Sequence, residues 1–258
     1  MMSFNSLLLK DPEKYGILFD IFRRSSNEGD VLFERFMRHV RVTQDGSGSL
    51  LDIGAADGTL TQRLMPYFAK IVAIDRTRDN AYALSALGIK THLGLWEQFE
   101  TDEKFDMVIA SHVLYYFGES QYIAECQRIR DSIAPNGVAF VAVNSHDGQY
   151  ADFMTRFYPE MNSGLSAFEA TTGLENNLKA NGVLCDTEKH SFSIRFENEI
   201  HFAYLCSFFL NCEVQDMSPS LTQRLQDYYM QELTPQGPQS KYMNANIDLH
   251  ILYNGGIQ

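Results

Sequence analysis

Two acidic side chains stand where a protein can bind the polar parts of a small ligand. Asp52 lies in an apolar run that leads into a turn of sequence GAADG, residues 54–58, and Asp75 ends the next apolar run, residues 71–75. Glycine and alanine carry almost no side chain, so the backbone of this turn can approach a ligand closely. A carboxylate at the end of the following strand can accept hydrogen bonds from ribose hydroxyls. The two segments together predict a nucleoside-binding site.

The glycine spacing indicates which kind of nucleoside site this is. Dinucleotide-binding folds use G-x-G-x-x-G, whereas here Gly54 and Gly58 are separated by three residues and no third glycine closes the pattern. The segment instead resembles motif I of the class I S-adenosyl-L-methionine (SAM)-dependent methyltransferases, an acid followed by G-x-G-x-G, with Ala56 replacing the middle glycine. Residues 105–112 resemble the fourth strand of that fold, and residues 133–143 resemble its fifth strand with the preceding turn.

This resemblance implies a fold and a methyl donor. The fold is α/β, with a Rossmann-like methyltransferase sheet of seven strands whose last strand is antiparallel. The donor is SAM, the product is S-adenosyl-L-homocysteine (SAH), and no metal is expected. In the family the turn approaches the amino-acid part of SAM, and the acid after the second strand binds the ribose. By position, the residues expected to bind SAM are Asp52, Gly54, Ala55, Ala56, Gly58, Asp75, Arg76, Leu95, Trp96 and Ser111.

Trp96 is the single tryptophan and follows the third apolar run. Its ring can lie against the adenine ring, and ordinary packing in the core is the alternative.

A polar row marks the last apolar segment of the chain. Asn246, Asp248 and His250 fall on one face of a strand, because strand side chains alternate with a period of two. Ligands of parallel α/β sheets collect at the carboxyl ends of the strands, where Ser111 and His112 also stand. An antiparallel last strand would bring Asn246 to the same pocket. A solvent-facing edge strand is the alternative for Asp248 and His250.

A narrower resemblance concerns the methyl acceptor. Three parts of the chain are similar to the histamine N-methyltransferase family, and the likeness extends over almost the whole chain. The residues that carry it are Lys14, Tyr15, Phe19, Phe22, Ser26, Glu28, His112, Val113, Leu114, Tyr115, Tyr116 and Asn246. In that family a helical corner covers the pocket, a glutamate binds the amine or imidazole, and an asparagine of the last strand completes the polar set. Glu28 and Asn246 match by position. His112 replaces a glutamine, and residues 148–153 lack the family's tryptophans.

The resemblance gives these residues roles. Glu28 would accept a proton or hold a cationic group, His112 would act as a base near neutral pH, and Asn246 would orient the acceptor. Aromatic faces favour a positively charged methyl donor or amine. The residues expected to line the acceptor site are Tyr15, Phe19, Phe22, Tyr115, Tyr116, Tyr150 and Phe153. The alternatives are a helix first-turn acid for Glu28, a hydrogen-bonded histidine at a strand end for His112, and core packing for the aromatic residues.

Hydrophobic periodicity places these residues on elements. Residues 12–43 read as two helices interrupted at the polar segment 24–30, and apolar runs alternate with helical patterns from 50 to 143. Further segments read as helices near 199–209 and 220–233 and as strands at 191–196 and 247–253. We expect effectively one domain. It consists of an N-terminal helical lid over 1–48 and a SAM-binding core over 49–258, with substrate-side insertions at about 147–182 and 198–240.

Composition limits the partners. The chain has 258 residues, 45% of them apolar, and a net charge of −12, which argues against nucleic acid because phosphate contacts need clustered Lys and Arg. The four cysteines show no C-x-x-C spacing and read as buried thiols of a reducing cytoplasm. No basic leader and no membrane-length apolar run is evident. We expect a cytoplasmic monomer or weak dimer that acts on a small molecule without a membrane.

The sequence therefore predicts methyl transfer from SAM to a small molecule, at an amine or ring nitrogen. O-methylation of a hydroxyl or carboxylate of a secondary metabolite is the alternative reaction. A SAM-binding module that has lost catalysis is the alternative outside the enzymes.

Overall fold

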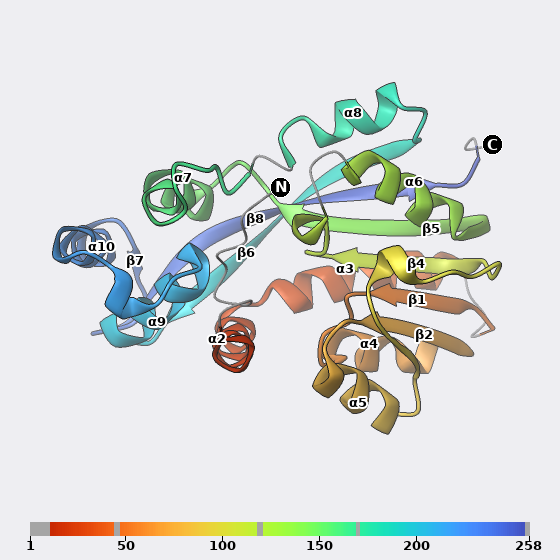
Figure 1. The fold of residues 1–258 in the computed structure, drawn as a ribbon, viewed down its shortest axis with the longest axis horizontal. Helices are drawn as coiled ribbons and strands as arrows, with labels where there is room; N and C mark the ends of the chain where they lie inside the picture. The colour runs from red at the N-terminus through yellow and green to blue at the C-terminus, as the bar shows by residue number, and fades with distance from the viewer. Residues whose placement is uncertain (1–10, 44–46, 118–120, 169–170, 256–258) are drawn as a thin grey trace. The chain divides into compact units, whose positions relative to one another are not determined.

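The computed structural model describes residues 11–43, 47–117, 121–168 and 171–255, and its elements are drawn in Figure 1. The chain divides into two compact units. The sheet unit comprises residues 32–143, 170–190 and 247–258, and the helical unit comprises residues 1–31, 144–169 and 191–246. One helix and two long strands run from one unit into the other: α3 (Glu28–Thr43), β6 (Cys185–Phe196) and β8 (Lys241–Tyr253).

The sheet unit is built on strands in the order β3-β2-β1-β4-β5-β8-β6. Strands β1 to β5 pair in parallel, and the short β7 pairs antiparallel with β8. The expected methyltransferase-type sheet, with antiparallel last strands, is confirmed. The strand bounds are β1 Ser49–Ile53, β2 Lys70–Asp75, β3 Lys90–Leu93, β4 Phe105–Ser111, β5 Ile133–Asn144 and β7 Thr234–Pro235.

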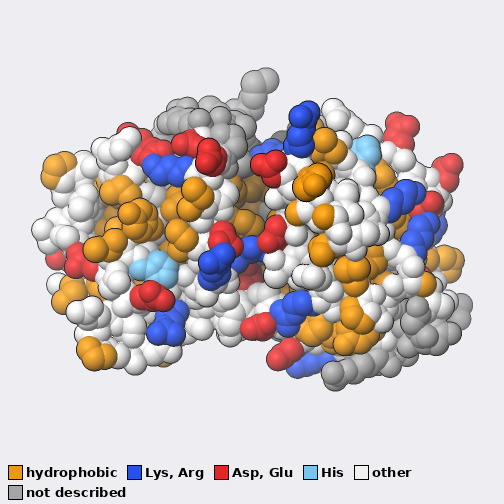
Figure 2. Space-filling model, turned by 90° about the horizontal axis from the view of Figure 1, so that it is seen from below, with side chains coloured by type: hydrophobic (Ala, Val, Ile, Leu, Met, Phe, Trp, Pro, Cys, Tyr) orange, Lys and Arg blue, Asp and Glu red, His pale blue; other side chains and the backbone are white. Residues whose placement is uncertain are grey.

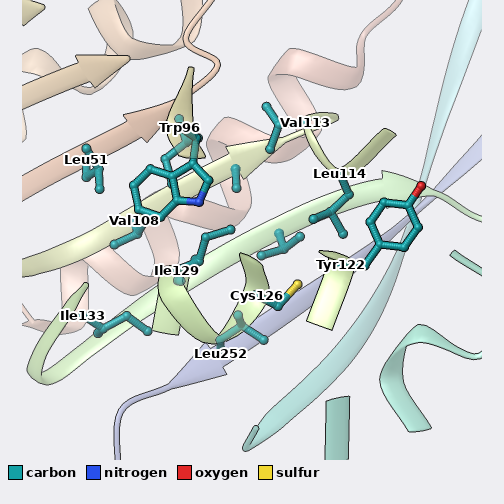
Figure 3. Close-up of a cluster of buried hydrophobic side chains, with 14 of the residues drawn as sticks. Leu51, Trp96, Val108, Val113, Leu114, Tyr122, Cys126, Ile129, Ile133 and Leu252 are labelled. Carbon is teal, nitrogen blue, oxygen red and sulfur yellow. The ribbon is translucent and has the colours of Figure 1, made fainter. Parts of the chain in front are cut away.

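Helices cover both faces of this sheet. Alternate side chains of the strands, such as Leu51 and Val108, pack with Cys126 and Ile129 of α6 in one buried cluster (Figure 3). On the other face, the ring of Phe140 lies 4.8 Å from that of Phe36 in α3. Burial on both faces explains why the strands read as continuous apolar runs rather than as alternating ones. The helices wholly within the unit are α4 Thr59–Leu64, α5 Arg78–Ala86, α6 Tyr122–Asp131 and α8 Leu174–Ala180, with 3₁₀ turns η1 Met65–Tyr67, η2 Trp96–Gln98 and η3 Leu114–Tyr116.

The helical unit contains the other helices. They are α2 Pro12–Ser25, α7 Gln149–Met161, α9 Glu199–Leu210 and α10 Pro219–Gln231, with the 3₁₀ turn η6 Val214–Asp216. Helix α9 is apolar on most of its surface and packs against α2, α7 and α10. A helix that is apolar all round is stable in water only when other elements surround it, and α9 is the centre of this unit.

The predicted helical corner is confirmed, with a specific cause. Helix α2 ends at Ser25 and α3 begins at Glu28. Between them, Ser26 forms an isolated antiparallel bridge with Ile194, and the Asn27 side-chain oxygen accepts a hydrogen bond from Ser193 N at 2.8 Å. These bonds to β6 replace helical hydrogen bonds, so the chain turns at this position.

Two sequence-based expectations change at the ends of the chain. Strand β8 lies between β5 and β6, so Asp248 and His250 are not on an edge strand. His250 is buried, its Nδ1 lies 2.8 Å from Thr187 Oγ1, and burial lowers its pKa.

Residues 32–43 of the expected lid pack within the sheet unit through Phe36. Residues 1–10 and 44–46 of the expected lid lie outside the described residues.

None of the described helices combines the length and the apolar character required to cross a membrane.

Candidate functional site

The turn after β1 depends on a left-handed backbone at three positions. Gly54, Ala56 and Gly58 have φ values of +72°, +51° and +81°. A Cβ at Gly54 would lie 2.3 Å from Val113 Cγ1, and one at Gly58 would lie 2.6 Å from Leu84 Cδ2. Both positions therefore favour glycine by conformation, and at Gly54 the neighbouring Val113 side chain also leaves no space for a Cβ. Ala56 adopts the left-handed region with a side chain, at a cost of roughly 1–2 kcal/mol.

Asp75 holds this turn. Its Oδ2 accepts a hydrogen bond from Ala56 N at 2.9 Å. Its Oδ1 accepts from Thr77 N at 2.8 Å and from Asn80 Nδ2 at 3.2 Å. The carboxylate is buried at the end of β2. One side chain thus connects the turn, the strand end and the start of α5, and it compensates the unfavourable conformation of Ala56.

Asp52 is a second buried carboxylate next to this turn. Thr61 Oγ1 donates a hydrogen bond to its Oδ2 at 2.5 Å. Burial raises the pKa of Asp52 to about 6, the Thr61 bond opposes this shift, and the charge of Asp75 adds to it. Asp52 therefore changes charge close to neutral pH. A cationic group placed beside it would favour the ionised form.

The end of β4 carries His112 in a strained conformation. Its φ is +56°, and its backbone N donates to Ala142 O at 2.9 Å. Its Nδ1 lies 3.4 Å from Tyr115 Oη, and the two rings are nearly parallel with centroids 5.9 Å apart. Ser111, the last residue of β4, is partly exposed just before it. His112 and Tyr115, predicted separately, form one side-chain pair.

Arg76 and Tyr116 also lie together in the sheet unit. The Arg76 guanidinium carbon is 4.9 Å from the centre of the Tyr116 ring, and Tyr116 is 40% exposed. The sequence places Arg76 with SAM and Tyr116 with the acceptor. Their contact puts Tyr116 beside the residue that follows Asp75.

Trp96 is a core side chain. It is 6% exposed and packs in the buried cluster with Leu51 and Val108 (Figure 3). The guanidinium carbon of Arg128 lies 4.6 Å from the ring centre, and Arg128 Nη2 donates to Trp96 O at 3.2 Å. These contacts correspond to the core-packing alternative. Its neighbour Leu95 is 39% exposed, so a ligand can reach this side chain.

The aromatic residues of α2 pack around one ring of α9 within the helical unit. The rings of Tyr15, Phe19 and Phe22 lie 5.4, 6.0 and 5.3 Å from the ring of Phe208 in α9. Phe153 is fully buried and contacts other rings of the unit, so it is a core residue. The first three rings are only partly buried and can still present apolar surface to a ligand.

Glu28 is a buried carboxylate whose charge acts on the Tyr150 hydroxyl. Glu28 is the first residue of α3 and is 9% exposed, and its backbone N donates to Ser26 Oγ at 3.1 Å. The Tyr150 ring packs edge-on against Phe209, 5.2 Å between centroids. Burial raises the pKa of Tyr150, and the negative charge of Glu28 raises it further. Tyr150 is therefore a neutral hydroxyl near an acid. Glu28 is indeed a first-turn acid, yet unlike most such acids it is buried.

Asn246 makes hydrogen bonds with both ends of its amide. Its Oδ1 accepts from Ser191 Oγ at 2.7 Å, and its Nδ2 donates to Asp147 O at 3.3 Å. Its backbone O accepts from Ser145 N at 3.0 Å. Asn246 thereby fixes the segment that leads into α7, the helix that carries Tyr150.

Sequence patterns missed several of these partners. Thr61, Asn80 and Ser191 bond to predicted residues, and Phe208 and Phe209 pack against predicted aromatic rings. Asn80 could have been suspected, because it lies five residues after Asp75 in the first turns of a helix. The others carry no spacing signal.

Across the part of the chain that the structure describes, no group of three or more His, Cys, Asp or Glu side chains is arranged to hold a metal ion. All four cysteines are free and buried, as expected.

A left-handed turn after the first strand, secured by a carboxylate at the end of the second, defines an α/β protein of the Rossmann-like nucleoside-binding class. Residues 25–192, well over half of the chain, match the methyltransferase domain family. The chain belongs to this family.

Two relatives agree with this membership. The chain is 27% identical to Nodulation protein S of Sinorhizobium fredii over 125 residues, 46% of this chain and 57% of that protein. It is 25% identical to the ubiquinone biosynthesis O-methyltransferase of Bradyrhizobium diazoefficiens over 167 residues, 57% of this chain and 65% of that protein. The matches thus span less than two thirds of these relatives.

The fold is shared with solved structures at low identity. A Bacillus halodurans C-125 protein assigned as a methyltransferase superposes with a TM-score of 0.61 at 16% identity, over 87% of this chain and 99% of that one. The YcgJ protein of Bacillus subtilis gives a TM-score of 0.57 at 13% identity, over 84% and 97%.

Proposed function

We propose that this protein transfers the methyl group of SAM to a nitrogen atom of a small acceptor molecule. Family membership supports the methyl donor. The observation that supports nitrogen is the buried carboxylate of Glu28, which lies near the Tyr150 hydroxyl in a unit rich in aromatic rings. A carboxylate and aromatic faces together favour a cationic amine or imidazole over a neutral or anionic acceptor.

The residues of the sheet unit fit SAM. Close approach of the backbone at Gly54 and Gly58 suits the amino-acid part, and the ionised form of Asp52 suits an ammonium group. Asp75 retains acceptor capacity beyond its three N–H partners, because a carboxylate has about four lone-pair sites. We propose that Ala55, Ala56, Arg76 and Ser111 line the same site, with Leu95 rather than the Trp96 ring meeting the adenine.

When bound, SAM supplies an electrophilic methyl carbon on a sulfonium sulfur. We propose that His112 takes the proton that the acceptor nitrogen loses as its bond to the methyl carbon forms and the carbon–sulfur bond breaks. Glu28 would hold a cationic part of the acceptor, and the rings of Tyr15, Phe19 and Phe22 would cover it. Tyr115, Tyr116 and Asn246 would orient it, in the case of Asn246 through α7. Positioning of this kind supplies much of the rate of a bimolecular transfer.

The test is a panel of amines, imidazoles, phenols and carboxylic acids, with SAH release as the readout. We expect turnover mainly with nitrogen nucleophiles. Glu28→Gln keeps the shape of the side chain and removes its charge, so it should weaken a cationic acceptor by about 1.5–3 kcal/mol while SAM affinity is unchanged. Glu34→Gln, an exposed position on the same helix, is the matched control.

O-methylation is the second candidate, and the O-methyltransferase relative favours it. Turnover confined to phenols or carboxylates, with no effect of Glu28→Gln on acceptor binding, would establish O-methylation in place of N-methylation. A non-catalytic SAM-binding module would bind SAM and release no SAH with any compound of the panel.

We further propose that α2 and the first turn of α3 act as a lid over the acceptor. Their aromatic rings and Glu28 support this proposal. Hydrogen exchange should then slow in residues 12–31 when SAH and a turned-over amine are both present, and equal exchange in the free protein would contradict it.

The free buried cysteines support a reducing, cytoplasmic setting, and the net charge of −12 supports a monomer or weak dimer without a nucleic-acid partner.

A further inference from the structure

Asp75 has a side-chain partner that no motif identifies. Asn80 Nδ2 donates a hydrogen bond to Asp75 Oδ1 at 3.2 Å, from the first turns of α5. We propose that Asn80 is a positioning residue for SAM: it orients the Asp75 carboxylate for the ribose hydroxyls without touching the ligand. This inference rests on the proposed binding of SAM.

The bonds to Asp75 divide between its two oxygens. Thr77 N and Asn80 Nδ2 both donate to Oδ1, whereas Ala56 N alone donates to Oδ2. Each carboxylate oxygen has about two lone-pair sites, so Oδ1 is saturated and Oδ2 keeps an open site. The backbone donors fix two points of the carboxylate. Asn80 adds a side-chain donor on Oδ1 that further resists rotation about the Cβ–Cγ bond, and it occupies the second site of Oδ1, so that Oδ2 is the oxygen left open to a ribose hydroxyl.

The position of Asn80 is itself fixed by packing. Leu84 lies one helical turn further along the same face of α5 and is fully buried. Its Cδ2 occupies the space that a Cβ of Gly58 would need, at 2.6 Å. Helix α5 therefore rests directly on the glycine turn. Its register against the turn determines where the Asn80 amide points.

The helix start gives an independent reason for the arrangement. Thr77 is the N-cap of α5, yet its side chain makes no capping bond. The Asp75 carboxylate accepts the Thr77 N–H instead, close to the positive end of the helix dipole. A carboxylate that caps a helix can swing between its donors. The Asn80 amide restricts that movement and favours one orientation before the ligand arrives.

The experiment measures binding of two probes by calorimetry: SAH and its 2′,3′-dideoxyribose analogue. In the wild type, SAH should bind more tightly because Asp75 meets its hydroxyls. In Asn80→Ala and Asn80→Leu, the Kd of SAH should rise by about fivefold, which corresponds to one lost hydrogen bond. The Kd of the dideoxy analogue should stay the same, so the ratio of the Kd of the analogue to the Kd of SAH should fall. Asn176→Ala, an exposed asparagine of α8, is the matched control.

The outcomes separate the two proposals. Equal weakening of both probes, or no weakening of either, would overturn the role of Asn80 while SAM binding stands. A wild type that binds neither SAM nor SAH would overturn the proposed function itself. If the Ala variant does not fold, the Leu variant retains the side-chain volume. In the wild type, the Asn80 side-chain amide signals in NMR should move on SAH binding and less on binding the analogue. Unmoved signals would also overturn the inference.

Discussion

The two units build their polar sites in different ways. In the sheet unit, Asp75 accepts hydrogen bonds from two backbone N–H groups and from one side-chain amide. These donors lie within 24 residues of one another in the sequence, so local chain geometry fixes the carboxylate. In the helical unit, Glu28 and Tyr150 come from helices far apart in the sequence, and the Tyr150 ring packs against Phe209 of α9. A site made from backbone geometry leaves a spacing in the sequence. A site made from packed side chains does not.

Substitution of Trp96 should have the largest effect. It tests whether the Trp96 ring is part of the core of the sheet unit. Trp96→Ala should lower the free energy of unfolding by about 3–5 kcal/mol, through the cavity it leaves beside Leu51 and Val108. SAH affinity of the folded fraction should change little. Chemical denaturation and calorimetry measure the two quantities. A large loss of SAH affinity with normal stability would instead support contact of the Trp96 ring with the adenine.

Asp75→Ala should have the next largest effect and should act only on the sheet unit. The loss of ribose contacts, together with the freed Ala56 N–H, should cost about 2–4 kcal/mol of SAM binding. Calorimetry checks the value, and Asp79→Ala, an exposed acid on α5, is the control. Unchanged SAM affinity in Asp75→Ala would remove the assignment of this site.

Asp52 links the same site to pH. Its pKa is raised from 3.8 to about 6, so the buried charge destabilises the fold above pH 6 and has no effect below about pH 4. Asp52→Asn should therefore be more stable than the wild type by up to about 3 kcal/mol at pH 8, with the difference vanishing near pH 4. Urea unfolding at both pH values measures it. A difference that is constant with pH would show that the pKa of Asp52 is the same in the folded and the unfolded protein.

Ser191→Ala gives the smallest effect and addresses the helical unit. Removing the donor to Asn246 should cost about 0.5–1.5 kcal/mol locally. Hydrogen exchange should quicken in residues 145–150, which Asn246 anchors, while exchange in residues 52–58 stays the same. Ser220→Ala, an exposed serine of α10, is the control. Faster exchange in both segments, or in neither, would contradict the anchoring role.

The sequence predicts the sheet unit better than the helical unit, because a site made from backbone geometry leaves a spacing in the sequence. The left-handed positions at 54 and 58 favour glycine, so the turn is visible in the sequence, and so is the acid that ends β2. Asn246 was visible as a polar residue on a strand. Its engagement with Ser191 and Asp147 depends on a strand pairing that periodicity cannot supply. Trp96 was ambiguous, because a single aromatic residue after a strand fits a ligand and a core equally well.

Strand lengths show the same limit. The apolar segments predict β6 from 191 and β8 from 247, whereas the strands begin at Cys185 and Lys241. Their first halves are partly exposed and polar, so the hydrophobic pattern does not mark them. Backbone pairing, which has no side-chain signature, extends both strands.

The contact of Gly54 with Val113 has a consequence for anyone who wishes to redesign this protein. A Cβ at Gly54 would overlap Val113 Cγ1, so the turn after β1 and the residue after His112 share one space. A substitution that enlarges either would move the other, and His112 already has an uncommon φ of +56°. Under the proposed roles of the turn in SAM binding and of His112 in proton removal, this packing links cofactor preference to acid–base behaviour. Laboratory evolution toward a bulkier donor analogue would have to change positions 54 and 113 together.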